Sequence, residues 1–368
     1  MNLSLKSSLR LLFLSTPVGP LGSGLGGGVE LTVANLARSL TTLGHRVTVV
    51  TPTGAQLDTL GLATSEVDII QVPGVLQNTA QNQGRSSPVV VSSSLANAWD
   101  YARQVQTHYD VLVNFAYDWL PFYLTPFLSV PVAHFVSMGS LSNEMDSAIA
   151  QVATRFPGSL GAYTQAQADT FSHLIPSPHW QVLGCGIDLT QYDYCPDPDD
   201  FLAWVGRISP EKGVEDAIVA ATAAGYPLKI YGKLEDAAYW QRLQPLIDQS
   251  TAAVDYCGFL PTEELQRSLA KARALLVTPR WIEAFGIVAI EAMACGVPVI
   301  AYRQGGPTEI VQPGETGWLV APSDVDEVVG AIAKIGEISR LACRHRAERY
   351  YSLPAWGKRF EKWLYTIV

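Results

Sequence analysis

The sequence is poor in charge of either sign and in cysteine, and it has no long hydrophobic run. Charged residues make up 16% of the 368 positions, and 25 Lys and Arg stand against 34 Asp and Glu, a net charge of −9. A nucleic-acid-binding protein carries a basic surplus instead, so we expect no such partner. Five cysteines without a Cys-x-x-Cys pair exclude a zinc site of the usual spacing. They favour free thiols in a reducing compartment, the cytoplasm.

The longest apolar run near the N-terminus is interrupted by Arg10, which leaves only Leu11–Leu14 before Pro17. That run is too short for the core of a signal peptide and far below the roughly 20 residues of a membrane-spanning helix. It is typical of a buried strand, and we expect no membrane association. With 48% hydrophobic residues, the chain is long enough for two domains of about 150 residues each.

Short apolar runs alternate with helical patterns along most of the chain, which predicts parallel sheets covered by helices on both faces. The predicted strands are Leu9–Thr16, Arg46–Thr51, Asp110–Phe115, Val130–Ser137, Leu160–Thr164, Gln181–Gly184, Phe201–Gly206, Leu228–Tyr231, Ala253–Gly258, Ala274–Thr278 and Pro298–Ala301. The Pro- and Asp-rich stretch Tyr192–Asp200 has the composition of a linker. The fold class is therefore α/β, with two doubly wound domains in tandem, residues 1–190 and 198–350. In such sheets ligands bind beyond the carboxyl ends of the strands, so we expect a cleft where the domains face each other.

A glycine-rich loop, Gly22–Gly28, follows the first predicted strand and opens a helix over Val29–Leu43. Backbone N–H groups at such a place can bind a phosphate or diphosphate. A dinucleotide site also needs an acidic residue near the end of the second strand, where this chain has Val49-Val50-Thr51-Pro52. The dehydrogenase interpretation loses most of its support, and a merely flexible turn is the alternative to a phosphate loop.

A second loop-like segment, Gly74–Ser94, is rich in Gln, Asn, Ser and Gly. Loops of this length inside compact domains are usually functional or disordered. A lid over a site and an irrelevant surface excursion are equally compatible with it.

Two features of the second half combine charges with strand ends. Arg207 and Lys212 lie five residues apart after a predicted strand, where a diphosphate would lie, although loop cations are more often merely solvated. Glu283 precedes a predicted helix that starts at Phe285-Gly286, and Glu291 lies about two turns inside it. Carboxylates beside free helix N–H groups suit a nucleotide sugar, since they accept hydrogen bonds from sugar hydroxyls while the helix terminus binds phosphate. The alternative explanation is that Glu283 only interacts favourably with the helix dipole and that Glu291 forms an ordinary salt bridge.

Several motifs in register resemble those of the family 4 retaining glycosyltransferases of the GT-B fold, also called glycosyl transferases group 1. They extend over essentially the whole chain and are Gly27–Glu30, Val205–Arg207 with Pro210–Gly213, Val254–Leu260, the pair Glu283 and Glu291, and Gly314–Val320. Cys185-Gly186-Ile187-Asp188 departs from the Asn-Gly-Val-Asp that family members commonly have before the second domain.

The resemblance implies a role for individual residues. Gly27 and Gly28 would meet the donor diphosphate, and Arg207 and Lys212 would neutralise it. His134 would contact the donor sugar near the reacting centre, although a histidine at a strand end is otherwise often structural. The remaining donor contacts implied are Glu291 for the ribose hydroxyls, Gly258, Phe259 and Leu260 near the base, and Glu283 with Ala284, Phe285, Gly286 and Ile287 at the hexose.

Transfer in this family is thought to occur on one face of the sugar, with a donor phosphate oxygen taking the acceptor proton. Fixed cations and a helix N-terminus can then stabilise the leaving diphosphate. Asp197-Pro-Asp199 has the spacing of the metal-binding motif of the other glycosyltransferase architecture but lies in the predicted linker. We therefore expect metal-independent transfer with no cofactor other than the nucleotide-sugar co-substrate.

The first 190 residues, which bind the acceptor in this architecture, hold seven Lys or Arg and eleven Asp or Glu. That surplus of acid disfavours an anionic acceptor or an anionic membrane surface. The candidate acceptor contacts are Tyr117, Asp118, Phe135 and Asn143. They suit a small uncharged molecule, and this half also resembles cyanobacterial pteridine glucosyltransferases, which use UDP-glucose and tetrahydrobiopterin.

The C-terminal stretch Pro354–Val368 places Trp356, Phe360, Trp363 and Leu364 on one helix face. The resemblance implies that this helix returns to the N-terminal domain, whereas a membrane or dimer contact is the alternative. Rival functions are another family 4 transferase acting on a sugar or lipid, a starch- or sucrose-type synthase, a sugar-nucleotide epimerase, and a non-catalytic nucleotide-sugar binder. The oligomeric state is left open.

Overall fold

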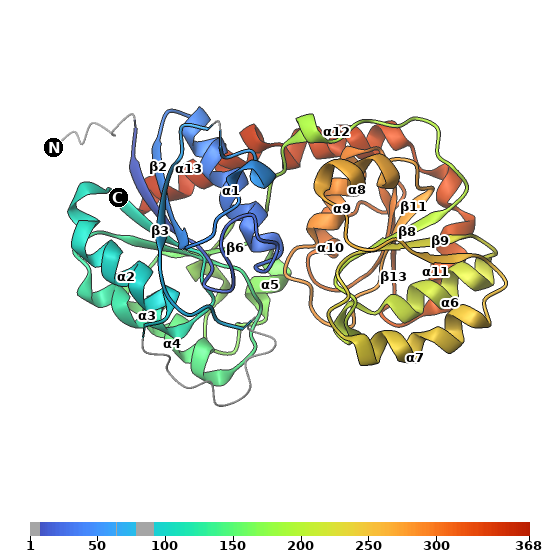
Figure 1. The fold of residues 1–368 in the computed structure, drawn as a ribbon, viewed down its shortest axis with the longest axis horizontal. Coiled ribbons are helices and arrows are strands. Elements are labelled where there is room, and N and C mark those ends of the chain that lie inside the picture. Colours follow the sequence, from blue (N-terminus) through green and yellow to red (C-terminus); the bar gives the residue numbers. More distant parts are fainter. Residues whose placement is uncertain (1–7, 64, 79–91) are drawn as a thin grey trace. The chain divides into compact units, whose positions relative to one another are not determined.

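The computed structural model of the chain describes residues 8–63, 65–78 and 92–368. By its internal contacts the chain divides into two compact units (Figure 1). Unit 1 comprises Met1–Gly186 together with Leu353–Val368, and unit 2 comprises Ile187–Ser352. Most of the Gln- and Asn-rich segment, residues 79–91, lies outside the described residues.

Unit 1 is built on a seven-stranded parallel sheet in the order β3-β2-β1-β4-β5-β6-β7. Its strands are β1 (Arg10–Leu14), β2 (Arg46–Pro52), β3 (Asp68–Val72), β4 (Val111–Asn114), β5 (Val132–Val136), β6 (Leu160–Ala162) and β7 (Trp180–Val182). Its α-helices are α1 (Gly28–Thr42), α2 (Ser94–Val105), α3 (Trp119–Leu124), α4 (Asn143–Arg155), α5 (Gln165–Asp169) and the C-terminal α13 (Leu353–Ile367). Short 3₁₀ helices are η1 (Leu57–Leu60), η3 (Gln106–His108), η4 (Thr125–Phe127) and η5 (Ser177–His179).

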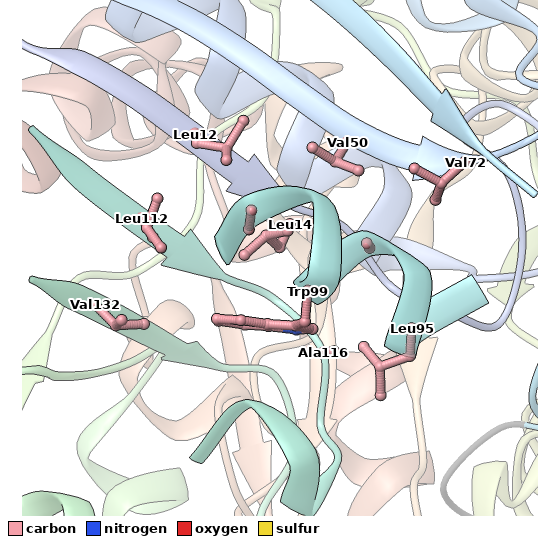
Figure 2. Close-up of a cluster of buried hydrophobic side chains, with 11 residues drawn as sticks. Leu12, Leu14, Val50, Val72, Leu95, Trp99, Leu112, Ala116 and Val132 are labelled. Carbon is pink, nitrogen blue, oxygen red and sulfur yellow. The ribbon is translucent and has the colours of Figure 1, made fainter. Parts of the chain in front are cut away.

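One face of this sheet is covered by α2, whose N-terminus is fixed by Ser93. The Ser93 hydroxyl accepts a 3.1 Å hydrogen bond from the Ala96 N–H, a standard N-cap. Figure 2 shows the buried Trp99 indole of α2 among aliphatic side chains of the sheet, including Leu14 and Leu112. Fully burying one aliphatic side chain such as Leu14 or Leu112 contributes about 1.5–3 kcal/mol. The packing of Trp99 against these side chains therefore holds α2 to the strands.

On the other face, the aromatic side of α13 is buried within unit 1. Trp356, Phe360, Trp363 and Leu364 are at most 2% exposed, and the Trp363 indole N–H donates to the Gly158 carbonyl at 2.8 Å. The Ser39 hydroxyl of α1 donates to the Leu353 carbonyl at 2.6 Å. This face is therefore an internal packing surface, which excludes it as a membrane or dimer contact.

Unit 2 contains a six-stranded parallel sheet in the order β10-β9-β8-β11-β12-β13. Its strands are β8 (Leu202–Val205), β9 (Leu228–Tyr231), β10 (Val254–Tyr256), β11 (Ala274–Val277), β12 (Val299–Tyr302) and β13 (Gly317–Val320). Its α-helices are α6 (Val214–Ala224), α7 (Ala237–Asp248), α8 (Thr262–Leu269), α9 (Ile287–Ala294), α10 (Pro307–Ile310), α11 (Val325–Ala333) and α12 (Arg340–Tyr351). Short 3₁₀ helices are η6 (Leu189–Gln191), η7 (Pro210–Lys212) and η8 (Ile335–Glu337). Two parallel α/β sheets confirm the predicted fold class.

The stretch Tyr192–Asp200, predicted as a linker, is part of unit 2 and lies against it. Tyr192 is buried, and the backbone N–H of Cys195 donates to the Cys295 carbonyl at 3.1 Å. The Asp199 N–H donates to the Lys271 carbonyl at 2.7 Å. A composition rich in Pro and Asp therefore marks an extended segment here, fixed by backbone hydrogen bonds to unit 2.

Within the described ranges, no helix has both the length and the apolar character needed to cross a bilayer.

Candidate active site

Because all six strands of unit 2 are parallel, the loops that follow them leave the sheet at the same end, and four of these loops carry candidate site residues. The loop after β8 carries Arg207 and Lys212, and the loop after β9 carries Glu235. Gly258–Leu260 follows β10, and Glu283 lies between β11 and α9. The strand order β10-β9-β8-β11 places these four loops side by side at the carboxyl ends of the strands.

Arg207 is held between two carboxylates. Its Nη2 donates to Glu211 Oε1 at 3.1 Å, and its Nη1 donates to Glu235 Oε2. The Ser209 hydroxyl donates to the same Oε1 of Glu211 at 2.8 Å, which fixes that carboxylate within its own loop. The guanidinium is thus oriented by protein groups, and its side chain is still 29% exposed.

Lys212 forms an ion pair with Glu283, so the two site residues predicted on separate loops are in direct contact. The Lys212 ammonium lies 4.9 Å from the centre of the Trp281 ring, and the Trp281 indole N–H donates to Glu283 Oε2 at 3.2 Å. A cation over an aromatic face is further stabilised by the ring quadrupole. The sequence analysis did not identify Trp281 as part of this group. Only its position two residues before Glu283 could have indicated it.

The loop between Glu283 and α9 is held by an adjacent glycine turn. The Gly306 N–H donates to the Glu283 carbonyl at 2.7 Å. Gly305 has φ +65°, and a Cβ there would lie 2.7 Å from the Glu283 nitrogen and closer still to its carbonyl oxygen. Only glycine fits this approach without displacing Glu283.

The helix that the loop enters begins at Ile287, directly after the predicted start at Phe285-Gly286. Gly286 is its N-cap with φ +95°. Ala284 and Phe285 are buried, the latter with its ring 6.1 Å from that of Tyr351. Their side chains therefore pack inside unit 2 and only their backbone groups can serve a ligand.

Glu291 is a buried carboxylate on α9. Its Oε1 accepts a 2.7 Å hydrogen bond from the Tyr192 hydroxyl, and burial raises the pKa of the carboxyl above its ordinary value. Burial also raises the pKa of Tyr192 well above that of a free phenol, so the hydroxyl stays protonated and donates. Tyr192 was assigned to the linker from composition, and nothing in its local sequence indicates this contact.

A backbone hydrogen bond connects the loop after β10 to the loop after β9. The Gly232 N–H donates to the Gly258 carbonyl at 2.8 Å. Phe259 is 66% exposed, an unusual position for a phenyl ring. Gly258 has φ +77° with open space where a Cβ would lie, and Leu260 is half-buried. An exposed ring beside an open backbone can stack on a flat ligand.

In unit 1 the glycine loop folds around a carboxylate of its own chain. Glu30, which is buried, accepts hydrogen bonds from the Gly26 N–H at 2.5 Å, the Gly24 N–H at 3.1 Å and the Ser23 hydroxyl at 3.1 Å. The N–H groups of Gly24 and Gly26 are therefore engaged with Glu30, which corrects the expectation that the whole loop meets an external anion. Gly27, at φ +57°, and Gly28 begin α1 beyond this carboxylate.

His134 does not lie at a surface. It is fully buried in β5, stacked on the Phe122 ring with centroids 4.3 Å apart. Its Nδ1 is 3.2 Å from the Asn114 side-chain nitrogen, and its Nε2 is 2.9 Å from the Thr125 hydroxyl. Burial lowers the pKa of His134 to about 3, so the ring is neutral. The prediction that His134 contacts the donor sugar is wrong, because both ring nitrogens have partners in the core and no atom of the residue reaches solvent.

The four candidate acceptor residues fall into two groups. Phe135 is a core residue, with its ring 4.6 Å from that of Tyr163 and 5.5 Å from that of Phe360, so the prediction that it contacts an acceptor is wrong. Tyr117 and Asp118 are half-buried just after β4, and Asn143 is exposed as the first residue of α4. These three remain available to a ligand.

Asp118 caps α3, because its Oδ1 accepts from the Leu120 N–H at 2.9 Å. Burial raises its pKa. Near Tyr117 lies a buried carboxylate that the sequence did not single out, Asp146, which accepts a 2.6 Å hydrogen bond from the Ser140 hydroxyl. Burial raises the pKa of Asp146 and that of Tyr117 as well.

The Asp197-Pro-Asp199 motif lies at the opposite edge of the unit 2 sheet. Both aspartates are exposed and precede the amino end of β8, whereas Arg207 follows its carboxyl end. Across residues 8–63, 65–78 and 92–368, no three His, Cys, Asp or Glu side chains are grouped so that they could hold a metal ion.

Comparison with protein families accounts for both halves of the chain. Residues 26–191 match the model described as "Glycosyltransferase Family 4", and residues 195–350 match "Glycosyl transferases group 1". The chain has the GT-B fold of the family 4 glycosyltransferases. Within this glycosyltransferase fold, Gly27 and Gly28 belong to the first matched region, and Arg207, Lys212, Glu283 and Glu291 belong to the second.

Curated relatives of this glycosyltransferase fold match only in part. D-inositol 3-phosphate glycosyltransferase of Mycobacterium avium is 34% identical over 165 residues, which are 41% of this chain and 39% of that protein. Glycogen synthase of Mycobacterium tuberculosis is 37% identical over 144 residues, 36% of this chain and 33% of that protein. The match to the exopolysaccharide phosphotransferase SCO2592 of Streptomyces coelicolor covers 14% of that protein. The chain therefore spans less than half the length of each of these curated relatives.

Solved structures of similar fold cover nearly the whole chain. Anabaena HepE in complex with UDP and glucose has a TM-score of 0.76 at 19% identity, covering 96% of this chain and 98% of that one. Sucrose-phosphate synthase from Thermosynechococcus elongatus has a TM-score of 0.75 at 19% identity, with the same coverage. At this identity the likeness shows the fold.

Proposed function

We propose that this chain is a retaining glycosyltransferase that moves a hexose from a nucleotide sugar, UDP-glucose, to a small uncharged acceptor. The observation that carries the proposal is the group formed by Arg207, Lys212, Glu283 and Glu291 on the loops and helix of unit 2. Two cations and two carboxylates match the needs of a diphosphate flanked by two hydroxylated sugars. The complex of HepE with UDP and glucose supports the choice of donor.

The diphosphate is the leaving group, and its negative charge grows as the bond to the sugar breaks. Arg207 and Lys212 are held in place by carboxylates before any donor binds, so they stabilise this charge without rearranging solvent. The first N–H groups of α9 add a further positive terminus beside Glu283. An oxygen of the leaving phosphate takes the acceptor proton on the same face of the sugar, which retains the anomeric configuration.

Each end of the donor has a separate set of groups. We assign the ribose hydroxyls to Glu291, whose carboxylate is held by Tyr192. The base would stack near Phe259, whose ring is exposed beside Gly258. The hexose would lie at Glu283, whose loop is held by the Gly305-Gly306 turn.

Transfer is proposed to need no metal ion, because fixed cations already occupy the place where a metal would neutralise the diphosphate. The Asp197 and Asp199 pair lies at the amino edge of the same sheet, too far along β8 to reach a group beside Arg207. Activity that is lost with EDTA and restored with Mg²⁺ would contradict this part of the proposal.

For the acceptor, unit 1 offers Tyr117, Asp118 and Asn143. An aromatic ring, a carboxylate and an amide suit a flat, uncharged molecule with several N–H and O–H groups, of which a tetrahydropterin is one. The five cysteines are all free thiols, which suits a reducing cytoplasmic location.

The proposal is tested by incubating the protein with UDP-glucose, ADP-glucose and GDP-mannose in turn, each with tetrahydrobiopterin, a simple sugar or a lipid alcohol. Release of UDP coupled to formation of an α-glucoside, identified by its anomeric proton, is the expected result. A β-linked product would contradict retention. A protein that binds UDP tightly and neither hydrolyses nor transfers would instead be a nucleotide-sugar binder, the alternative function.

A further inference from the structure

The cations assigned to the diphosphate are already neutralised. Arg207 and Lys212 supply two positive charges, and Glu211, Glu235 and Glu283, which contact them, supply three negative ones. A dianionic or trianionic diphosphate thus meets a group whose net charge is −1. Binding requires at least one carboxylate to give up its cation.

Of these three carboxylates, Glu211 is built into the loop of Arg207. It lies four residues along the same turn, and its Oε1 also accepts from the Ser209 hydroxyl. Its backbone carbonyl accepts a 2.9 Å hydrogen bond from the Arg280 N–H. Glu211 therefore aims the guanidinium and stays in place when a ligand arrives.

Glu235 reaches Arg207 from a different strand. The loops after β8 and β9 are joined at Ile208, whose N–H donates to the Lys233 carbonyl at 2.9 Å and whose carbonyl accepts from the Asp236 N–H at 3.1 Å. These two bonds fix the backbone on both sides of Glu235, directly beside Arg207. The carboxylate itself is 27% exposed. Partly exposed ion pairs of this kind add little stability, so Arg207 can exchange this partner at low cost.

We propose that Glu235 occupies the phosphate position on Arg207 in the free protein and competes with the donor for it, so that it weakens donor affinity. This inference rests on the proposed function, because it assigns Arg207 to the donor diphosphate. A phosphate that binds Nη1 of Arg207 displaces the Glu235 carboxylate and then lies beside its negative charge. Both effects oppose binding of the donor, and both favour release of the nucleoside diphosphate product.

The test is the affinity of UDP, measured by calorimetric titration of the full-length protein at low ionic strength. Glu235→Gln keeps the size of the side chain and removes its charge. We expect its Kd for UDP to fall three- to tenfold, roughly 0.7–1.4 kcal/mol. The affinity for uridine, which has no phosphate, is expected to stay unchanged.

Asp200→Asn is the matched control. Asp200 forms an ion pair with Arg273 at 3.2 Å, and like Glu235 it is a carboxylate that pairs with an arginine. Asp200 and Arg273 both precede the amino ends of their strands, away from the candidate donor site. Its Kd for UDP should equal that of the wild type. In an Arg207→Ala background, Glu235→Gln should tighten binding less than it does alone, because the competition for Arg207 is then absent.

If the wild-type protein binds UDP and the Glu235→Gln variant binds it equally or more weakly, the inference alone is overturned. Weaker binding would in addition assign Glu235 to positioning Arg207. Absence of UDP binding by the wild-type protein would instead overturn the proposed function. An equal gain in affinity for uridine would show that the variant changed the nucleoside contacts, and this too counts against the inference.

Discussion

The Tyr192 hydroxyl donates a 2.7 Å hydrogen bond to Oε1 of Glu291 across 99 residues of sequence. Tyr192 lies at the start of unit 2 in an extended segment, and Glu291 lies in α9 beside the candidate donor site. The carboxylate is buried, so this hydroxyl partly replaces the water that it lost on folding. The segment that enters unit 2 thereby fixes the group assigned to the ribose.

Replacing Tyr192 with Phe tests this relationship. The change removes one hydrogen bond to a buried carboxylate, and we expect it to lower the free energy of unfolding by about 1.5–3 kcal/mol. UDP should bind more weakly, since Glu291 is no longer oriented. Urea unfolding and UDP titration measure the two effects. Tyr350→Phe, at a 40% exposed tyrosine, is the control and should change neither. A Tyr192→Phe variant with wild-type UDP affinity would separate Tyr192 from the donor site.

A second prediction concerns the turn that holds Glu283. Gly305→Ala places a Cβ 2.7 Å from the Glu283 nitrogen at a residue with φ +65°. The left-handed backbone alone costs about 1–2 kcal/mol for a residue other than glycine, and the displaced loop should weaken donor binding further. Gly330→Ala, in α11 with open space around its Cβ, is the matched control and should stabilise the protein by roughly 0.5–1 kcal/mol. UDP-glucose affinity within twofold of wild type in Gly305→Ala would contradict the role given to this turn.

Lys212 offers a test of the leaving-group contact. Lys212→Met keeps most of the side-chain volume but removes the charge that pairs with Glu283. We expect kcat to fall by about 10²–10³, the usual loss when one fixed charge-stabilising group is removed. Initial rates of UDP release at saturating donor measure it, with Lys334→Met, at an exposed lysine, as the control. A kcat within threefold of wild type would remove Lys212 from the mechanism.

The buried His134 should make the free energy of unfolding depend on pH. Its pKa is about 3 in the folded protein, whereas an unfolded histidine titrates near pH 6.5, so below that pH the unfolded state takes up the proton. The contribution of the neutral His134 ring to the free energy of unfolding is fully present above about pH 6.5 and is lost as the pH falls toward 3. Between pH 7 and pH 5 it should decrease by about 2 kcal/mol.

The measurement is urea unfolding at pH 7 and pH 5 of the wild type, His134→Gln and the exposed-histidine control His108→Gln. His134→Gln should be less stable at pH 7 and lose less stability on acidification, and His108→Gln should behave as the wild type does. Equal pH dependence in all three proteins would show that His134 is not a buried neutral histidine.

The fold was largely predictable because parallel strands that are buried on both faces read as continuous apolar runs, as Leu11–Leu14 does. Two strands were missed for local reasons. β3 (Asp68–Val72) contains the polar residues Asp68 and Gln71, and only its last residue is fully buried. β13 (Gly317–Val320) has four residues, and its two central ones are half-buried. Neither forms the long continuous apolar run of a strand that is buried on both faces.

The candidate site was predictable where a charged residue follows a strand, as with Arg207, Lys212 and Glu283. It was not predictable where the decisive partner lies far away in sequence, as Tyr192 does from Glu291 and Glu235 does from Arg207. Phe135 shows the opposite error, since an aromatic residue near a strand end reads as a ligand contact even when the core surrounds it. The role expected for His134 came from the family resemblance, which carries no information on the burial of this side chain.

The measurement that most directly tests the central claim, that unit 2 binds a nucleoside diphosphate through Arg207 and Lys212, is thermal unfolding with UDP, ADP and GDP. Wild-type protein at 100 times the Kd of UDP should gain about 2.7 kcal/mol of stability, and Arg207→Ala/Lys212→Ala at the same concentration should gain almost none. No stabilisation of the wild type by any of the three nucleotides, or equal stabilisation of the double variant, would contradict the account.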